Sequence, residues 1–256
     1  MSRAASVISR GRGVVRLGLF AGLTVLHGEC LALAARRRRL DAGSQARITQ
    51  EWGGAICRAL GIRVERAGDR PEGAVLLVAN HRSYADVAAL AACAPMAFIA
   101  KAEIQRWPLL GRAATHAGTI FVSRGDAQSG AGALRRMRAA LAAGVSIAVF
   151  PEGTTCASPS IGAFQPGAFR LAAAGGIPVV PVAIEYARAS DAWTDPDDRT
   201  FAAHFITCFG RRQVAVRIAF GPRLVGGQAD ALRADAHRWI EAHLVAPREE
   251  PDALSI

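Results

Sequence analysis

A histidine and an aspartate stand five residues apart in the segment 76–90, which reads LLVANHRSYADVAAL. Asn80 and His81 end a short apolar run, and Asp86 opens a stretch rich in Ala and Leu. A neutral histidine can accept a proton on one ring nitrogen while a carboxylate fixes its tautomer through the other. On a continuous helix the two side chains would point about 140° apart. They can therefore meet only if His81 lies in the turn before a helix.

The same aspartate has a structural interpretation that remains open alongside the catalytic one. Ser83 is a candidate N-cap, and Asp86 three residues later completes a pattern similar to a capping box. The two roles are compatible, because a helix start would also hold the carboxylate in place.

Two more polar clusters follow apolar runs of the kind that form buried strands. Ser123, Arg124 and Gly125 follow 118–122, and the sequence PEGTT at 151–155 follows 145–149. Ligands of open α/β sheets bind outside the carboxyl ends of the strands. If these strands are parallel, we expect the clusters to meet at one edge. The alternatives are a surface arginine in a loop and, for Glu152, a turn residue without a partner.

The type of chemistry follows from what accompanies the histidine. The sequence contains no GxSxG nucleophile motif, and no cysteine lies in a nucleophile motif. We therefore expect His81 to act as a general base on the hydroxyl of a substrate. Arg124 could bind a phosphate group with both arms of its guanidinium. The five cysteines are odd in number and lack CxxC spacing, which predicts neither a disulfide framework nor a metal site, and favours a reducing compartment.

Alternating apolar runs and helical patterns define the elements that would hold these residues. The pattern predicts strands at 62–66, 74–79, 96–100, 118–122, 145–149, 178–184 and 214–220. It predicts helices at 45–60, 83–93, 101–106, 128–143, 165–175 and 228–245. This order is typical of an α/β domain with a largely parallel sheet flanked by helices. We place that domain at 61–246, with a C-terminal tail at 247–256.

The N-terminal segment predicts contact with a membrane. An apolar stretch at 17–35 contains His27 and Glu29, and four arginines follow it at 36–39. No convincing A-x-A cleavage site closes the segment, and its two polar residues make spanning costly. A helix lying in one leaflet, with its arginines among anionic headgroups, fits better, and a buried amphipathic helix is the alternative. We expect residues 1–60 to be membrane-associating helices on the cytoplasmic face of the inner membrane.

The balance of charge agrees with a membrane partner. The net charge of +10 favours anionic partners, although codon bias towards arginine would also produce it. No helix-turn-helix signature, RNA-binding aromatic motif or zinc-finger spacing is present, so nucleic acid is not an expected partner.

Taken together, the motifs resemble the glycerolipid acyltransferase superfamily, of the 1-acylglycerol-3-phosphate O-acyltransferase type. The resemblance covers about 62–222, and the order and spacing of its blocks agree. Those blocks are N-H-x4-D at 80–86, an aromatic residue with arginine three residues on at 121–124, F-P-E-G-T at 150–154, and a proline-bearing apolar strand at 177–182.

The resemblance implies a role for each motif. His81 would deprotonate the acceptor hydroxyl, which attacks the thioester of acyl-CoA or acyl-carrier protein, and Asp86 would orient His81. The acceptor would be 1-acylglycerol 3-phosphate, giving phosphatidate for phospholipid synthesis. No acyl-enzyme, metal or cofactor is implied, and no oligomeric state. The residues implied in binding the acceptor are Asn80, Lys101, Arg124, Glu152, Gly153 and Thr154.

One departure from the family pattern leaves a second acceptor open. Many members have arginine after the F-P-E-G-T block, whereas this chain has Thr155. A phosphate contact is then missing, and a lyso-ornithine lipid becomes an alternative acceptor. A non-catalytic basic protein that binds lipid or nucleic acid is the alternative of another class, but it gives no reason for a histidine–aspartate pair at a strand end.

Overall fold

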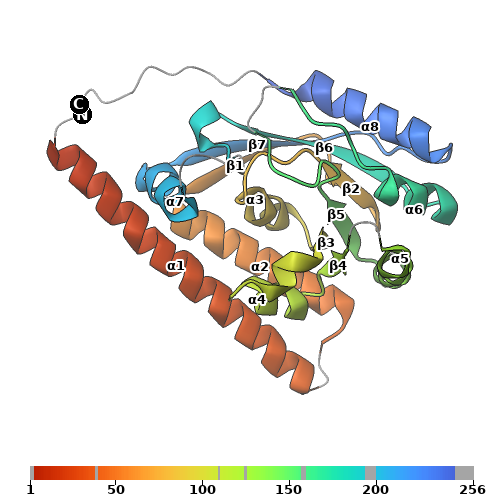
Figure 1. Ribbon diagram of the computed structural model, residues 1–256, viewed down its shortest axis with the longest axis horizontal. Helices are drawn as coiled ribbons and strands as arrows, with labels where there is room; N and C mark the ends of the chain where they lie inside the picture. Colours follow the sequence, from red (N-terminus) through yellow and green to blue (C-terminus); the bar gives the residue numbers. More distant parts are fainter. Residues whose placement is uncertain are drawn as a thin grey trace.

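The computed structural model describes residues 3–37, 40–108, 110–123, 126–156, 160–193 and 200–245. These residues form one seven-stranded sheet (Figure 1). Adjacent strands are parallel except for the β6–β7 pair, so that β1 and β7 run opposite to the other five. In spatial order the strands are β1 (Ile62–Ala67), β7 (Val214–Phe220), β6 (Val179–Tyr186), β2 (Leu76–Ala79), β5 (Ser146–Val149), β3 (Met96–Lys101) and β4 (Ile120–Val122).

Helices cover both faces of the sheet, as Figure 1 shows. One hydrophobic cluster joins one face to α2 (Ala42–Leu60), α3 (Asp86–Cys93) and α7 (Phe201–Gly210). A second cluster joins the other face to α5 (Ala127–Ala142), α6 (Gly167–Gly175) and α8 (Ala229–His243). All four residues of β2 are buried, which is typical of a parallel strand covered on both sides. The predicted α/β architecture is confirmed.

Local signals in the sequence set several helix ends. The side chain of Asp41 accepts the Ser44 N–H at the start of α2, and Asp126 accepts two N–H groups at the start of α5. Helix α2 ends at Gly61, whose φ of 71° lies in the left-handed region that glycine favours. Such signals act within a few residues, and the helices predicted at 45–60 and 128–143 agree with α2 and α5 to within three residues at each end.

The sequence pattern does not predict two of the helices. They are α4 (Leu110–His116) and α7, which reads FAAHFITCFG. Helix α7 is rich in aromatic and β-branched residues and lacks charge, a composition that does not favour a helix. Its burial beneath the N-terminal helix outweighs that propensity. The segment predicted as a helix at 101–106 is a 3₁₀ helix, η1 (Ala102–Arg106), and a second short 3₁₀ helix, η2 (Ala189–Asp191), was also not predicted.

Helix α1 (Arg3–Arg36) lies along one side of the molecule, drawn in red in Figure 1. It packs on α7, α2 and α4. Glycines permit the close approach: a Cβ on Gly13 would come within 2.3 Å of the Ile206 carbonyl oxygen, and one on Gly28 within 3.2 Å of Ala113. Arg12 and Arg16 donate to backbone carbonyls at the end of α7 and just beyond it.

The packing is continuous across the domain boundary expected near residue 60. Ile56, Cys57 and Leu60 of α2 belong to the same hydrophobic cluster as the central strands. The N-terminal helices are therefore part of the layer that covers one face of the sheet. The expected tail at 247–256, with Arg38 and Arg39 of the basic run, lies outside the described residues.

Candidate active site

The carboxyl ends of β2 and β5 lie side by side, because the two strands are parallel neighbours. His81 follows β2 and Glu152 follows β5, so the first and third polar clusters meet as predicted. Strand β4 points the same way but is separated from β5 by β3. The second cluster therefore begins two strands away at the same edge.

His81 and Asp86 form the pair that their spacing allowed. The Nδ1 atom of His81 lies 2.8 Å from Oδ2 of Asp86. A carboxylate oxygen accepts in this bond, so Nδ1 carries the hydrogen, and in the neutral imidazole Nε2 then keeps its lone pair. In the part of the chain that the structure describes, no protein group bonds to Nε2. The imidazole is 17% exposed and is stacked on Phe150 at 4.1 Å between ring centroids.

Asp86 is fully buried, and hydrogen-bond donors surround its carboxylate. Besides His81, the backbone N–H groups of Arg82 and Ser83 donate to Oδ2 at 2.6 and 2.9 Å, and the hydroxyl of Tyr186 donates to Oδ1 at 2.7 Å. A buried charge needs such compensation. The predicted cap is corrected in part: α3 starts at Asp86 after Ala85, so Ser83 is not its N-cap, although the carboxylate does reach back to the Ser83 N–H.

The loop after β5 holds the backbone of His81 from both sides. Oε1 of Glu152 accepts the His81 N–H at 2.9 Å, and the Cys156 N–H donates to the His81 carbonyl at 2.8 Å. Oε2 of Glu152 accepts the Gly162 N–H at 2.9 Å. Gly153 takes a φ of 71° in the turn that aims Glu152 inward. The geometry gives Glu152 a positioning role that the sequence did not reveal, while its expected contact with the acceptor stays a prediction.

Asn80 is also used within the fold. Its amide nitrogen donates to the Ile184 carbonyl at 2.9 Å, and its amide oxygen accepts the Ile184 N–H at 2.7 Å. The side chain is fully buried. Both ends of its amide are occupied by β6, which gives Asn80 a structural role, while its expected contact with the acceptor stays a prediction.

The remaining predicted residues lie around the same edge or outside the described chain. Lys101 ends β3 with an exposed side chain, and Thr154 is exposed in the loop after β5. Arg124 and Gly125 fall outside the described residues, so the predicted phosphate contact stays a prediction. Ser123, just before them, donates its N–H to the Ser129 hydroxyl at the start of α5.

Three residues near the pair were not singled out from the sequence. Phe150 supplies the surface on which the imidazole stacks, and Tyr186 donates to Asp86. Arg82 is buried, and its guanidinium donates to the carbonyls of Cys156 and Ser160, which ties the β2 and β5 loops together. Phe150 lies within the F-P-E-G-T block and Arg82 within the N-H-x4-D block, whereas no motif around Tyr186 points to the site.

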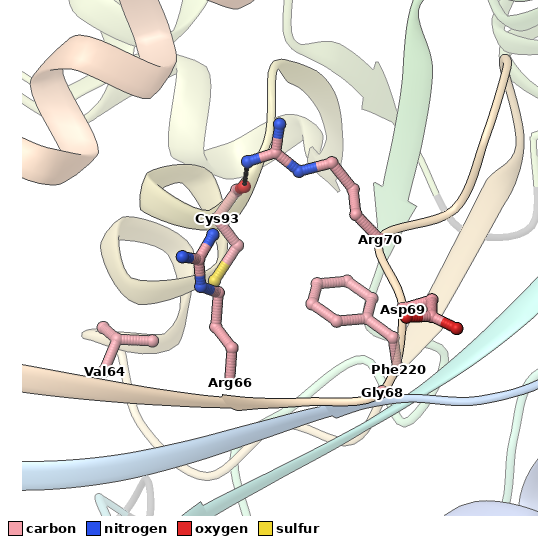
Figure 2. A pocket seen from close by; sticks show the side chains of 7 residues that line it. All are labelled: Val64, Arg66, Gly68, Asp69, Arg70, Cys93 and Phe220. Atoms are coloured by element: carbon pink, nitrogen blue, oxygen red, sulfur yellow. Dashed lines mark hydrogen bonds between the residues drawn. The ribbon is translucent and has the colours of Figure 1, made fainter.

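A cavity of about 510 Å³ lies at the opposite edge of the sheet (Figure 2). Its lining includes Arg66, Arg70 and Phe220, near the ends of β1 and β7, which run opposite to β2. Arg70 donates to the Cys93 carbonyl across it. This cavity is therefore separate from the histidine–aspartate pair.

Comparisons with known proteins agree with this geometry. Residues 61–185 match the family model described as Acyltransferase. The chain is 36% identical to the lyso-ornithine lipid O-acyltransferase of Pseudomonas aeruginosa, over 71% of each chain. It is 34% identical to the 1-acyl-sn-glycerol-3-phosphate acyltransferase of Neisseria meningitidis, over 58% of this chain and 60% of that one.

A solved structure has the same fold. The crystal structure of the 1-acyl-sn-glycerophosphate acyltransferase from Thermotoga maritima superimposes with a TM-score of 0.66, covering 91% of this chain and 97% of that one. The two sequences are 19% identical, so this likeness concerns the fold. The family match and the similarity to the Pseudomonas protein lead to one conclusion: this chain belongs to the acyltransferase family.

Proposed function

We propose that this acyltransferase moves an acyl chain from a thioester to the free hydroxyl of a lysolipid, with His81 as general base. The observation that carries the proposal is the hydrogen bonding of the His81 imidazole ring. Nδ1 is held by the buried carboxylate of Asp86, which leaves Nε2 of this partly exposed ring as the nitrogen that can take a proton. This is the arrangement that a base needs before it can remove a proton.

The reaction then balances without any further group from the protein. Nε2 takes the proton of the acceptor hydroxyl as its oxygen attacks the thioester carbonyl. The C–S bond breaks, an ester C–O bond remains, and the leaving thiolate takes the proton back from the imidazolium. Asp86 stays ionised throughout and stabilises the positive ring. The acyl donor is a co-substrate, acyl-CoA or acyl-carrier protein.

For the acceptor, we favour lyso-ornithine lipid. The support is the 36% identity to the Pseudomonas lyso-ornithine lipid O-acyltransferase over 71% of both chains, together with Thr155 in place of an arginine. A phosphomonoester is a dianion that guanidinium groups bind well, so losing one weakens the case for a phosphate. Lysophosphatidate is the second candidate, favoured by the Neisseria relative and by Arg124.

Membrane association belongs to the same proposal, because the acceptor is a lipid. In the described residues α1 is the one helix long and apolar enough to cross a bilayer. Two of its polar groups contact the protein: His27 is buried beside Trp52, and Glu29, although its own side chain is exposed, pairs with Arg112 of α4. Most of its exposed side is apolar, with Val7, Ile8, Val14, Val15, Leu19, Val25, Leu26 and Leu33, while Arg10 and Arg36 are exposed nearer its two ends. A helix with this polarity fits a position on the bilayer surface, with the protein on one side of it.

The acceptor is tested with the purified chain in mixed micelles. Lysophosphatidate and lyso-ornithine lipid are offered separately, each with acyl-CoA and with acyl-carrier protein, and kcat/KM is measured for all four pairs. A higher kcat/KM for lyso-ornithine lipid supports the favoured acceptor, and the reverse order replaces it with lysophosphatidate. Absence of transfer to both lysolipids would overturn the proposed function.

A further inference from the structure

Tyr186 reaches the catalytic pair because β6 is longer than its neighbour. Pairing between β2 and β6 ends at Ala79 and Val182, and β6 continues four residues further, to Tyr186. The side chain is buried, 4% exposed, on the same face of the sheet as α3. There its hydroxyl lies 2.7 Å from Oδ1 of Asp86, which is 100 residues away in the sequence.

The two carboxylate oxygens of Asp86 differ in the number and kind of their hydrogen-bond donors. Oδ2 accepts from His81 and from two backbone N–H groups. Among the described residues, Tyr186 is the one donor to Oδ1. A fully buried carboxylate oxygen without a donor would favour rotation of the group towards another partner. Such a rotation would weaken the hold of Asp86 on the imidazole.

The position of Tyr186 is itself fixed by a neighbour of the histidine. The Asn80 amide bonds to both backbone groups of Ile184, which extends the β2–β6 pairing beyond the end of β2. Ile184 and Tyr186 are two residues apart and so point to the same face of the strand. The turn that carries His81 thus sets the register of the tyrosine.

We propose that Tyr186 is a positioning residue for catalysis: its hydroxyl holds the carboxylate of Asp86 in its orientation towards His81, and so acts on the reaction through Asp86 and His81. The inference rests on the proposed role of His81 as general base. Burial raises the pKa of the Tyr186 phenol well above its usual value of 10, so the hydroxyl remains a donor at any working pH.

Kinetics of Tyr186→Phe test the inference against a matched control. The chain has two tyrosines, and Tyr84 is a second largely buried phenol, bonded at 3.1 Å to Nδ1 of His204 on α7. Tyr186→Phe should lower kcat roughly 10- to 150-fold, the range of one hydrogen bond to a charged group, with acceptor and donor KM within about twofold. Tyr84→Phe should keep kcat within about twofold while losing comparable thermal stability.

A double-mutant cycle separates positioning from general weakening of the fold. In an Asp86→Asn background the charge is gone, so adding Tyr186→Phe should cost at most about threefold more in kcat. Multiplicative losses would overturn the inference, and so would an effect on KM alone.

The two tyrosines also allow a test that does not use activity. Protein grown with 3-fluorotyrosine has two ¹⁹F resonances, which Tyr84→Phe assigns. Asp86→Asn should shift the Tyr186 resonance and leave that of Tyr84 in place. An unmoved Tyr186 resonance would refute the contact. If His81→Ala retained activity, the proposed function would fail instead, and the ¹⁹F result would still judge the contact.

Discussion

Replacing Asp86 with asparagine removes a charge while almost preserving the shape of the site. The amide oxygen can take the place of Oδ2, facing His81 and the N–H groups of Arg82 and Ser83. The amide nitrogen then faces the Tyr186 oxygen, which can accept a hydrogen bond. His81 keeps its tautomer, and what is lost is the negative charge that stabilises the imidazolium as it forms.

The size of the loss follows from distance and burial. Two unit charges about 4 Å apart interact by about 4 kcal/mol at an effective dielectric constant near 20. Because the imidazole is 17% exposed, solvent screens part of this. We therefore expect about 2–4 kcal/mol, or roughly 30- to 900-fold in kcat, with little change in KM.

The assay is steady-state acyl transfer in micelles with the preferred lysolipid. Asp191→Asn is the matched control: Asp191 is also a buried carboxylate, but it pairs with Arg211 beside α7. That variant should lose stability and keep its kcat. A loss in Asp86→Asn below about fivefold, or one confined to KM, would refute the reasoning.

The other predictions probe the base, the membrane face, the acceptor and the thiols. His81→Ala should lower kcat on the order of 10²- to 10⁴-fold without changing the circular dichroism spectrum, and retention of a tenth of the rate would contradict the base role. Leu26→Glu, on the exposed side of α1, should weaken co-sedimentation with anionic vesicles, whereas the exposed Asp235→Ala should not; equal binding of both would argue against that membrane face. Arg124→Ala should raise the KM for lysophosphatidate by roughly 30-fold or more and leave the KM for lyso-ornithine lipid unchanged. Equal effects on the two KM values would contradict the phosphate contact. Burial raises the pKa of Cys57 to about 12 and that of Cys93 to about 11, so a thiol reagent at pH 8 should label Cys30 and leave these two until unfolding, as mass spectrometry of the peptides would show.

The packing of α1 is the reason for testing membrane binding with a point substitution and not with a deletion. Deleting residues 1–40 would remove Leu31 and Ala32, which are buried, and uncover the side of α7 that carries Phe205. Loss of vesicle binding after such a deletion could then reflect an altered fold. A single charge on the exposed side changes the membrane face and leaves the buried side intact.

Most strands and helices, and the pairing of His81 with Asp86, could be predicted from local sequence patterns alone. About a dozen residues encode strand β2, the turn at His81 and the helix at Asp86. They do so through an apolar run, a short polar segment and a helical pattern. Helix ends such as Asp41 and Gly61 are equally local. The pairing of His81 with Asp86 was predictable because the turn between them leaves few ways for the two side chains to lie.

The contacts that hold the pair in place could not be predicted, because they depend on the fold of the whole sheet. Tyr186 and Glu152 reach Asp86 and His81 from 100 and 71 residues away, through strands whose order and register arise from packing of the whole sheet. The same holds for Asn80, whose type suggested a ligand contact but whose amide completes the pairing with β6. It also holds for α7, where burial beneath α1 overrides a composition that does not favour a helix. Spacing along the chain reports local geometry, whereas these contacts depend on which strands become neighbours, and that choice minimises the exposed apolar surface of the entire domain.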